Sequence, residues 1–119
     1  MQEQRISVRT NLLDVHVKIS TDGQKWSDVL ALDISDGGLG FVSDVEFPKG
    51  TKLMIQGEVS DHIKNMNINC ECKVVFSTSY SEDKTMHGVK FVDISRVQRT
   101  SLSIFIEQMV TKYPSLLLE

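Results

Sequence analysis

Residues 68–76 read INCECKVVF, and this stretch decides the fold class. Apolar or sulfur-bearing side chains occupy every second position, namely Ile68, Cys70, Cys72, Val74 and Phe76. Alternation of period two is typical of a strand that buries one face, because successive side chains of a strand point to opposite sides. The stretch therefore predicts a half-buried β-strand, with Phe76 facing the core.

The same period recurs on both sides of this strand. We expect further strands over residues 11–20, 26–34, 39–41, 51–59 and 87–94. Turn-forming residues separate them at 21–24, TDGQ, and 47–50, FPKG, and the polar stretches 60–67 and 77–84 are expected to be loops. In residues 26–34 the predicted apolar face contains Trp26, Leu30, Leu32 and Ile34, which leaves Asp33 and Ser35 on the solvent side.

The period changes after residue 94. Ser95 and Gln98 form a capping-box pattern, and an apolar stripe with helical spacing follows: Val97, Leu102, Phe105, Ile106, Met109, Val110 and Tyr113. We expect a helix over about 96–112, ended by Pro114. Short strands with frequent turns and one final helix predict a small antiparallel barrel or sandwich, flanked or plugged by the helix.

The chain has 119 residues, 40% of them hydrophobic and 24% charged, which is the size and composition of one globular domain. Cys70 and Cys72 are expected to be buried, reduced thiols, and the three histidines lack any zinc-type spacing. The first ten residues are polar, and no apolar stretch is long enough for a membrane span. These features predict a cytoplasmic protein with no metal site and no membrane insertion.

The net charge of -3 argues against binding to long nucleic acid, which usually requires a broad basic face. An anionic ligand would have to be met by a local group of arginines. The sequence contains no nucleophile elbow, phosphate loop or paired-carboxylate spacing, so we expect no enzymatic activity.

Residues 33–38, DISDGG, form the most unusual local motif. Asp33 offers a carboxylate and Ser35 a hydroxyl, and Gly37 and Gly38 follow with no side chains to block a flat ring or a phosphate. Asp, Ser and Gly are also the commonest turn formers, so the motif taken alone favours plain turn chemistry over a ligand site.

Arg5 and Arg9 lie four residues apart, ahead of the first expected strand. Arginine presents a planar fork of donors that matches phosphate oxygens and the O6/N7 edge of guanine. Two arginines in a terminal arm are usually just solvated, so the pair taken alone favours that interpretation over a binding site.

Taken together, the two motifs and the strands that follow resemble the PilZ domain family, which is defined by RxxxR followed by (D/N)xSxxG. The matching residues are Arg5 and Arg9 for the first motif, then Asp33, Ser35 and Gly38 for the second. Residues 39–41, LGF, and residues 88–91, GVKF, are similar to later stretches of such domains. The resemblance extends over essentially the whole chain.

The resemblance implies an all-β fold: a six-stranded antiparallel β-barrel with a C-terminal α-helix. Residues 1–10 would be a flexible arm that carries RxxxR, and residues 11–119 the barrel with its helix. It also implies that the ligand is cyclic di-GMP, bound without a further cofactor by Arg5, Arg9, Asp33, Ser35 and Gly38. Gln4 is an additional candidate, because the position before RxxxR influences how many ligands bind in the family. Gly37, within the second motif, is a further candidate.

The function implied is that of a bacterial second-messenger receptor without catalytic activity. The arm would become ordered over the ligand and change a surface that a downstream protein reads. The alternative is an adaptor of the same fold that acts through protein contacts without any ligand.

Overall fold

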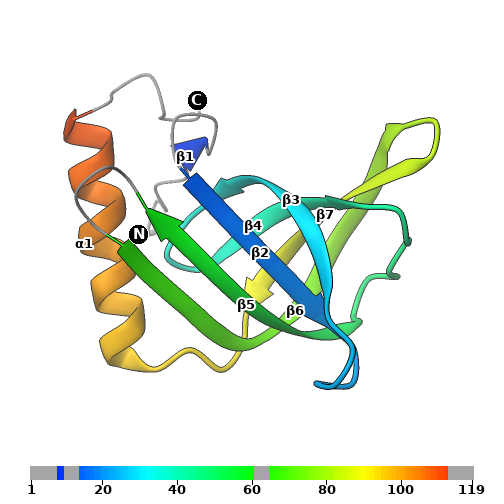
Figure 1. The fold of residues 1–119 in the computed structure, drawn as a ribbon, viewed down its shortest axis with the longest axis horizontal. Helices are drawn as coiled ribbons and strands as arrows, with labels where there is room; N and C mark the ends of the chain where they lie inside the picture. Colours follow the sequence, from blue (N-terminus) through cyan, green and yellow to red (C-terminus); the bar gives the residue numbers. More distant parts are fainter. Residues whose placement is uncertain (1–7, 10–13, 61–64, 113–119) are drawn as a thin grey trace, which may run out of the picture.

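The computed structural model describes residues 8–9, 14–60 and 65–112. Its elements are β1 (Val8–Arg9), β2 (Asp14–Ser20), β3 (Ser27–Ile34), β4 (Gly38–Ser43), β5 (Lys52–Ser60), β6 (Asn65–Ser81), β7 (Lys84–Phe91) and α1 (Arg96–Lys112). Strands β2 to β7 pair in the order β3-β2-β5-β6-β7-β4, and β4 returns to pair with β3. Every pairing is antiparallel. The predicted six-stranded antiparallel barrel with a C-terminal helix is confirmed (Figure 1).

Two glycines with positive φ make the tight turns at one end of the barrel. Gly23, at φ 77°, lies in the β2–β3 connection, where its N–H donates to the Ser20 hydroxyl at 2.8 Å. Gly50, at φ 94°, follows Pro48, whose carbonyl accepts from Thr51 N at 3.1 Å. Both turns lie within the stretches that the sequence predicted, because only glycine adopts such φ values without strain.

The core fills the barrel interior and continues under the helix. Phe41, Ile55, Val59, Cys72 and Leu102 are completely buried within it. His87 also lies in this interior, stacked on Phe41 at 5.0 Å between ring centroids, and its Nε2 accepts from Phe47 N at 2.9 Å. Its strand β7 pairs with β4 on one side and with β6 on the other, so His87 lies on an interior strand of the sheet.

Helix α1 stands beside the barrel next to β6 (Figure 1). The Ser95 hydroxyl accepts from Gln98 N at 3.1 Å, as the capping pattern predicted. Leu102, Phe105, Ile106 and Met109 bury the inner face of the helix. Val97 is 78% exposed, so its place in the predicted buried stripe is wrong. Tyr113 falls outside the described residues.

Strand β6 is longer than the sequence indicated. Residues 77–84 were expected to form a loop, but β6 continues to Ser81 and pairs with β7 as far as Lys84. The resulting hairpin projects beyond the barrel (Figure 1). Its polar side chains carry no core-facing period, because both faces of a projecting hairpin meet solvent.

Two register shifts break the alternation of inward and outward side chains from which the buried faces of β3 and β6 were predicted. In β3 the pairing with β4 skips Leu32, and in β6 the pairing with β7 skips Val75. A skipped residue of this kind is a β-bulge, and it reverses which face the following residues occupy. Because of the bulge in β3, Leu30 does not share a face with the buried Ile34 and is 59% exposed. Because of the bulge in β6, Phe76 does not share a face with the buried Val74 and is 47% exposed. The prediction that Leu30 and Phe76 face the core is wrong.

Candidate functional site

A shallow hollow of about 370 Å³ lies on the outer face of the barrel, over β3, β4, β6 and β7. Its lining includes Asp33, Ser35, Gly37, Gly38, Gly40, Phe76, Met86, Gly88 and Lys90. Most of the DISDGG motif thus borders one surface, together with residues from the other half of the chain.

Asp33 provides the carboxylate at one side of the hollow. Burial raises its pKa above the ordinary 3.8, and a hydrogen bond from Gly40 N opposes that rise. Its two carboxylate oxygens lie 3.1 and 3.2 Å from the place where a Cβ on Gly40 would be. The absence of a side chain at Gly40 therefore lets the carboxylate lie close over β4.

Ser35 is only 8% exposed, so the expectation that it faces solvent is wrong. Its N–H donates to Gly38 O at 2.9 Å, and its hydroxyl also contacts that carbonyl at 3.3 Å. The same hydroxyl accepts from Gly37 N at 3.2 Å. In this structure Ser35 closes the turn between β3 and β4, which is the turn role that the motif taken alone also fitted.

Gly37 and Gly38 are buried where β4 meets β7. Gly37 O accepts from Phe91 N at 2.8 Å. A Cβ on Gly38 would lie 2.0 Å from Val89 O, a backbone atom that cannot easily give way. Gly38 is thus needed for the close approach of β4 and β7, so the fold itself requires glycine at this position, with or without a ligand.

The arginine motif reaches the same region through β1. This short strand pairs with β3 so that Val8 lies opposite Ile34 and Arg9 lies opposite Asp33. Arg5 and Gln4 fall outside the described residues. The structure therefore brings the backbone of Arg9 directly beside Asp33, at the edge of the hollow.

The residues that the sequence predicted for the site do not include Gly40, Phe76, Met86, Gly88 and Lys90, which also line this hollow. Gly40 and Gly88 pair with each other across β4 and β7. Both glycines lie in the stretches 39–41 and 88–91 that resemble the family, and glycine within a strand often marks a close approach of a ligand or another chain segment. Their positions could therefore have pointed to the site. Phe76 was assigned to the core because no sequence pattern marks the bulge at Val75.

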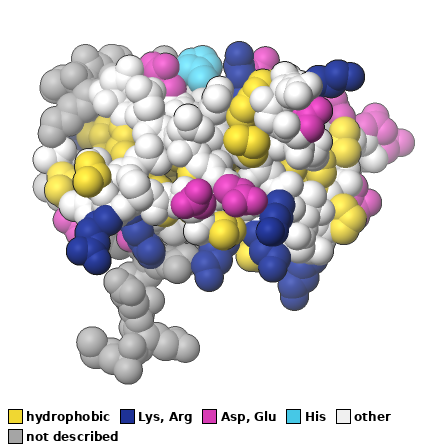
Figure 2. Space-filling view, turned by 90° about the horizontal axis from the view of Figure 1, so that it is seen from below, with side chains coloured by type: hydrophobic (Ala, Val, Ile, Leu, Met, Phe, Trp, Pro, Cys, Tyr) yellow, Lys and Arg dark blue, Asp and Glu magenta, His cyan; other side chains and the backbone are white. Residues whose placement is uncertain are grey.

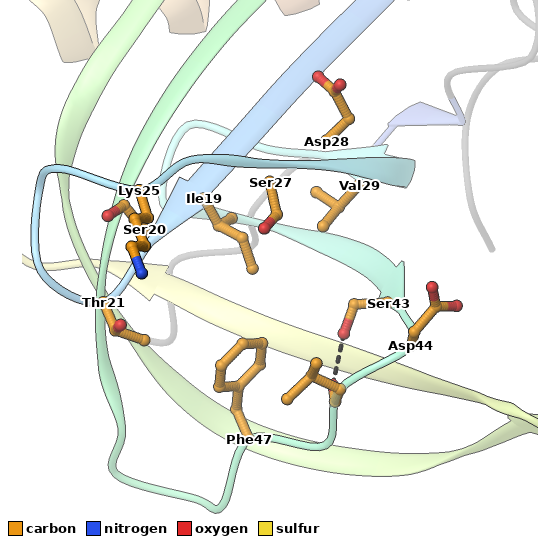
Figure 3. A pocket seen from close by; sticks show the side chains of 11 residues that line it. Ile19, Ser20, Thr21, Lys25, Ser27, Asp28, Val29, Ser43, Asp44 and Phe47 are labelled. Carbon is orange, nitrogen blue, oxygen red and sulfur yellow. Dashed lines mark hydrogen bonds between the residues drawn. The ribbon is translucent and has the colours of Figure 1, made fainter.

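A second hollow, of about 300 Å³, lies at the other end of β3 (Figure 3). The Phe47 ring points toward Ile19 there, and Val29 adds a further apolar side chain. Asp28 and Asp44 border it and Lys25 is the cation among its lining residues. Two carboxylates against one ammonium make this hollow a poor match for a ligand with two phosphates.

The cysteine thiols offer no reactive group. Both are buried and free, and burial raises the pKa of Cys70 to about 11 and that of Cys72 to about 12. Thiols with such pKa values stay protonated and are weak nucleophiles and weak metal ligands. Among the described residues, no group of three or more His, Cys, Asp or Glu side chains is arranged to hold a metal ion.

Charges on the surface are mixed. Figure 2 shows one face on which Lys and Arg side chains lie among Asp and Glu side chains. No helix within residues 8–9, 14–60 and 65–112 has the length and apolar character needed to cross a bilayer.

Comparison with solved structures supports the fold. MotI/DgrA, an inhibitor of motility from Bacillus subtilis, superposes with a TM-score of 0.77 at 18% identity, over 95% of this chain and 54% of that one. The PilZ domain of YcgR from Escherichia coli, solved with cyclic di-GMP, superposes with a TM-score of 0.69 at 12% identity, over 97% of this chain and 96% of that one. MrkH from K. pneumonia, solved in complex with cyclic di-GMP, superposes with a TM-score of 0.76 at 11% identity, over 97% of this chain and 55% of that one.

This chain spans about half the length of the MotI/DgrA and MrkH chains. No curated protein matches it with significance. The family model for the PilZ domain matches residues 2–108, which include both motifs and all strands of the barrel. The chain therefore belongs to the PilZ domain family.

Proposed function

We propose that this protein is a cyclic di-GMP receptor that binds its ligand in the hollow beside Asp33. The observation that carries the proposal is the pairing of Arg9 with Asp33 across β1 and β3. It joins the two family motifs at one edge of a surface hollow that is large enough to hold part of a dinucleotide. YcgR and MrkH, which share the fold, have been solved with this ligand.

The chemistry of the bordering residues fits the ligand. The Asp33 carboxylate would accept hydrogen bonds from the N1 and N2 groups of a guanine. Arg5 and Arg9 would pair with phosphates or with the O6/N7 edge, and Lys90, exposed in the lining, would add positive charge. Ser35 and Gly38 would act by shaping the turn that holds Asp33 in place.

The receptor would act without catalysis. Contacts of Arg5 and Arg9 with the ligand would change the conformation of the N-terminal arm, and that change would alter a surface read by a downstream protein. Cyclic di-GMP is made and degraded inside bacteria, so the receptor would work in the cytoplasm.

A thermal melting series tests the proposal. Cyclic di-GMP should raise the Tm of the protein in a concentration-dependent way, because a ligand that binds only the folded state stabilises it. GTP and cyclic GMP at equal concentration are the controls and should produce a much smaller shift. If cyclic di-GMP produces no shift and calorimetry detects no binding, the ligand-independent adaptor is the better description.

A further inference from the structure

Three lysines lie directly opposite one another across strands β5, β6 and β7. Lys52 pairs with Lys73, and Lys73 pairs with Lys90. All three side chains are exposed, and paired residues of a sheet project to the same face, so the lysines form a row on the outside of the barrel. We call this set the lysine row. Neighbouring strands are about 4.8 Å apart, so the row extends over about 10 Å.

The lysine row is unfavourable for the isolated fold. Opposite charges stabilise directly paired positions of a sheet, whereas like charges destabilise them. Within the described part of the chain, no ion pair joins a carboxylate to Lys52, Lys73 or Lys90. Glu71, two residues before Lys73 on the same face of β6, is half-buried opposite Met54. A positive surface that the fold itself leaves without an ion pair is suited to an anionic partner.

Exposed aliphatic side chains adjoin the lysine row on both sides. Met54 of β5 and Val92, just after β7, lie on one side, each two residues beyond a lysine of the row. Val75 lies on the other side, because β6 runs antiparallel to both neighbouring strands. The surface therefore combines a cationic centre with apolar margins, and an occupant that fits it must carry both negative charge and apolar side chains.

The spacing of the lysine row matches one face of an α-helix. Side chains three or four positions apart on a helix have Cβ atoms about 5–6 Å apart, which is close to the strand spacing of about 4.8 Å. A helix that crosses β5, β6 and β7 can thus hold a carboxylate over each lysine. On one face of an extended strand successive side chains are about 6.6 Å apart, so an extended segment matches the row less well.

A broad anionic surface fits this face less well than a single helix does. A bilayer or a long polyanion would meet the whole side of the barrel, and the net charge of -3 opposes that approach. A narrow helix meets the lysine row and few of the surrounding charges. The charge distribution therefore favours a protein segment as the occupant.

We propose that the lysine row is a docking surface for a partner protein. The partner presents a helix face that carries Asp or Glu residues one turn apart, with apolar residues beside them. This inference goes beyond the proposed function and does not depend on it, because Lys52 and Lys73 do not line the hollow beside Asp33. The like-charge repulsion of the free protein is then relieved when the partner binds.

Fluorescence anisotropy with a labelled helical peptide tests the surface. The peptide carries Glu at positions i, i+4 and i+7 and Leu beside them. Wild type should bind it saturably and more weakly as salt rises, Lys73→Glu should lose about 10-fold or more in affinity, and Lys73→Arg should retain it. Lys18→Glu is the matched control, because Lys18 is an exposed lysine of β2 that pairs with Gln56, and its affinity should stay within about 2-fold of wild type. No binding by wild type, or an equal loss in Lys18→Glu, would overturn the proposal.

Two further probes separate the docking surface from simpler attractions. A peptide of the same composition, with its Glu residues distributed around the helix, should bind at least about 10-fold more weakly. Equal binding of the two peptides would show attraction to net charge alone and reject the surface. Vesicles of phosphatidylglycerol are the second probe. Vesicle binding that is lost in Lys73→Glu, without peptide binding, would assign the row to a membrane and reject a protein partner.

Thermal melts of the same variants separate lost binding from lost folding. Lys73→Glu should have a higher Tm than wild type, because it replaces two like-charge pairs with two attractive pairs. A lower Tm would contradict the repulsion on which the inference rests. If the peptide binds while cyclic di-GMP does not, the proposed function fails and the docking surface stands. If cyclic di-GMP binds while the peptide does not, the docking surface alone is rejected.

Discussion

Arg9 lies directly opposite Asp33 in the antiparallel pairing of β1 with β3. These residues belong to two separate sequence motifs, and β2 and most of β3 lie between them in the chain. Strand β1 consists of Val8 and Arg9, so among the described residues a ladder of two residue pairs connects the two motifs. The pairing places the backbone of Arg9, from the arginine motif, at the edge of the hollow that Asp33, Gly38 and Gly40 border.

Asp33→Asn should stabilise the unliganded protein. Burial raises the pKa of the Asp33 carboxyl, so its ionised form is disfavoured in the fold. The contribution of the Asp33 carboxyl to stability is then full below its unfolded pKa and is lost as pH rises through its folded pKa. Asparagine removes the charge and keeps an acceptor for Gly40 N. We expect a higher Tm at pH 7, with no gain at pH 3, in melts monitored by circular dichroism. A lower Tm at pH 7 would contradict the burial argument.

Ser35→Ala should destabilise the fold by about 1–3 kcal/mol, because it leaves the buried Gly37 N–H without its acceptor. Urea unfolding would measure the change. Ser79→Ala, at an exposed position of β6, is the control and should be nearly neutral. If both variants unfold at the same urea concentration as wild type, the hydroxyl of Ser35 has no role in the turn.

Gly38→Ala should cost about 1–3 kcal/mol or more, since its Cβ would lie 2.0 Å from Val89 O and the strands would have to separate. Gly57→Ala is the matched control within β5, where the new Cβ would meet Val17 Cγ2 at an ordinary 3.5 Å. Chemical denaturation of both proteins gives the comparison. Equal stability of the two variants would show that β4 and β7 can relax at this point.

His87 should make the protein less stable in mild acid. Burial lowers the pKa of His87 below 6.5, and its Nε2 is engaged as an acceptor for Phe47 N. Below about pH 6.5 the unfolded chain therefore takes up a proton that the folded chain refuses, and the free energy of unfolding falls as pH decreases. Denaturation at pH 7.5 and 5.5 should show this loss.

In His87→Gln, which keeps an acceptor but cannot titrate, the loss between pH 7.5 and 5.5 should be smaller. His16, exposed on β2, provides the control substitution His16→Gln, which should retain the wild-type dependence. An identical pH dependence in wild type and His87→Gln would remove His87 as its source.

The strands and the helix could be predicted because burial imposes a period on the sequence. Residues 68–76 and 96–112 each show one uninterrupted period, and the elements that form there agree with it up to Val74 and over the buried helix face. The turn at Gly23 could be predicted for a different reason, which is that few residues adopt positive φ.

The outer face of the site could be predicted only in part. Motif resemblance identified Asp33 and the glycines that follow it, but Leu30 and Phe76 were assigned to the wrong face. A bulge depends on how two strands meet, and neither Leu32 nor Val75 carries a local signal for it. The exposure of the Phe76 ring therefore follows from the pairing of β6 with β7 and could not be predicted from the sequence of β6 alone.

Calorimetric titration of cyclic di-GMP into wild type, Arg9→Ala, Asp33→Ala and the double variant tests the central claim most directly, which is that Arg9 and Asp33 hold one ligand together. We expect saturable binding to wild type and a loss of about 10- to 100-fold in each single variant, with the double variant losing less than the product of the two. Wild-type affinity in Asp33→Ala, or losses that simply multiply in the double variant, would contradict a shared ligand at this pair.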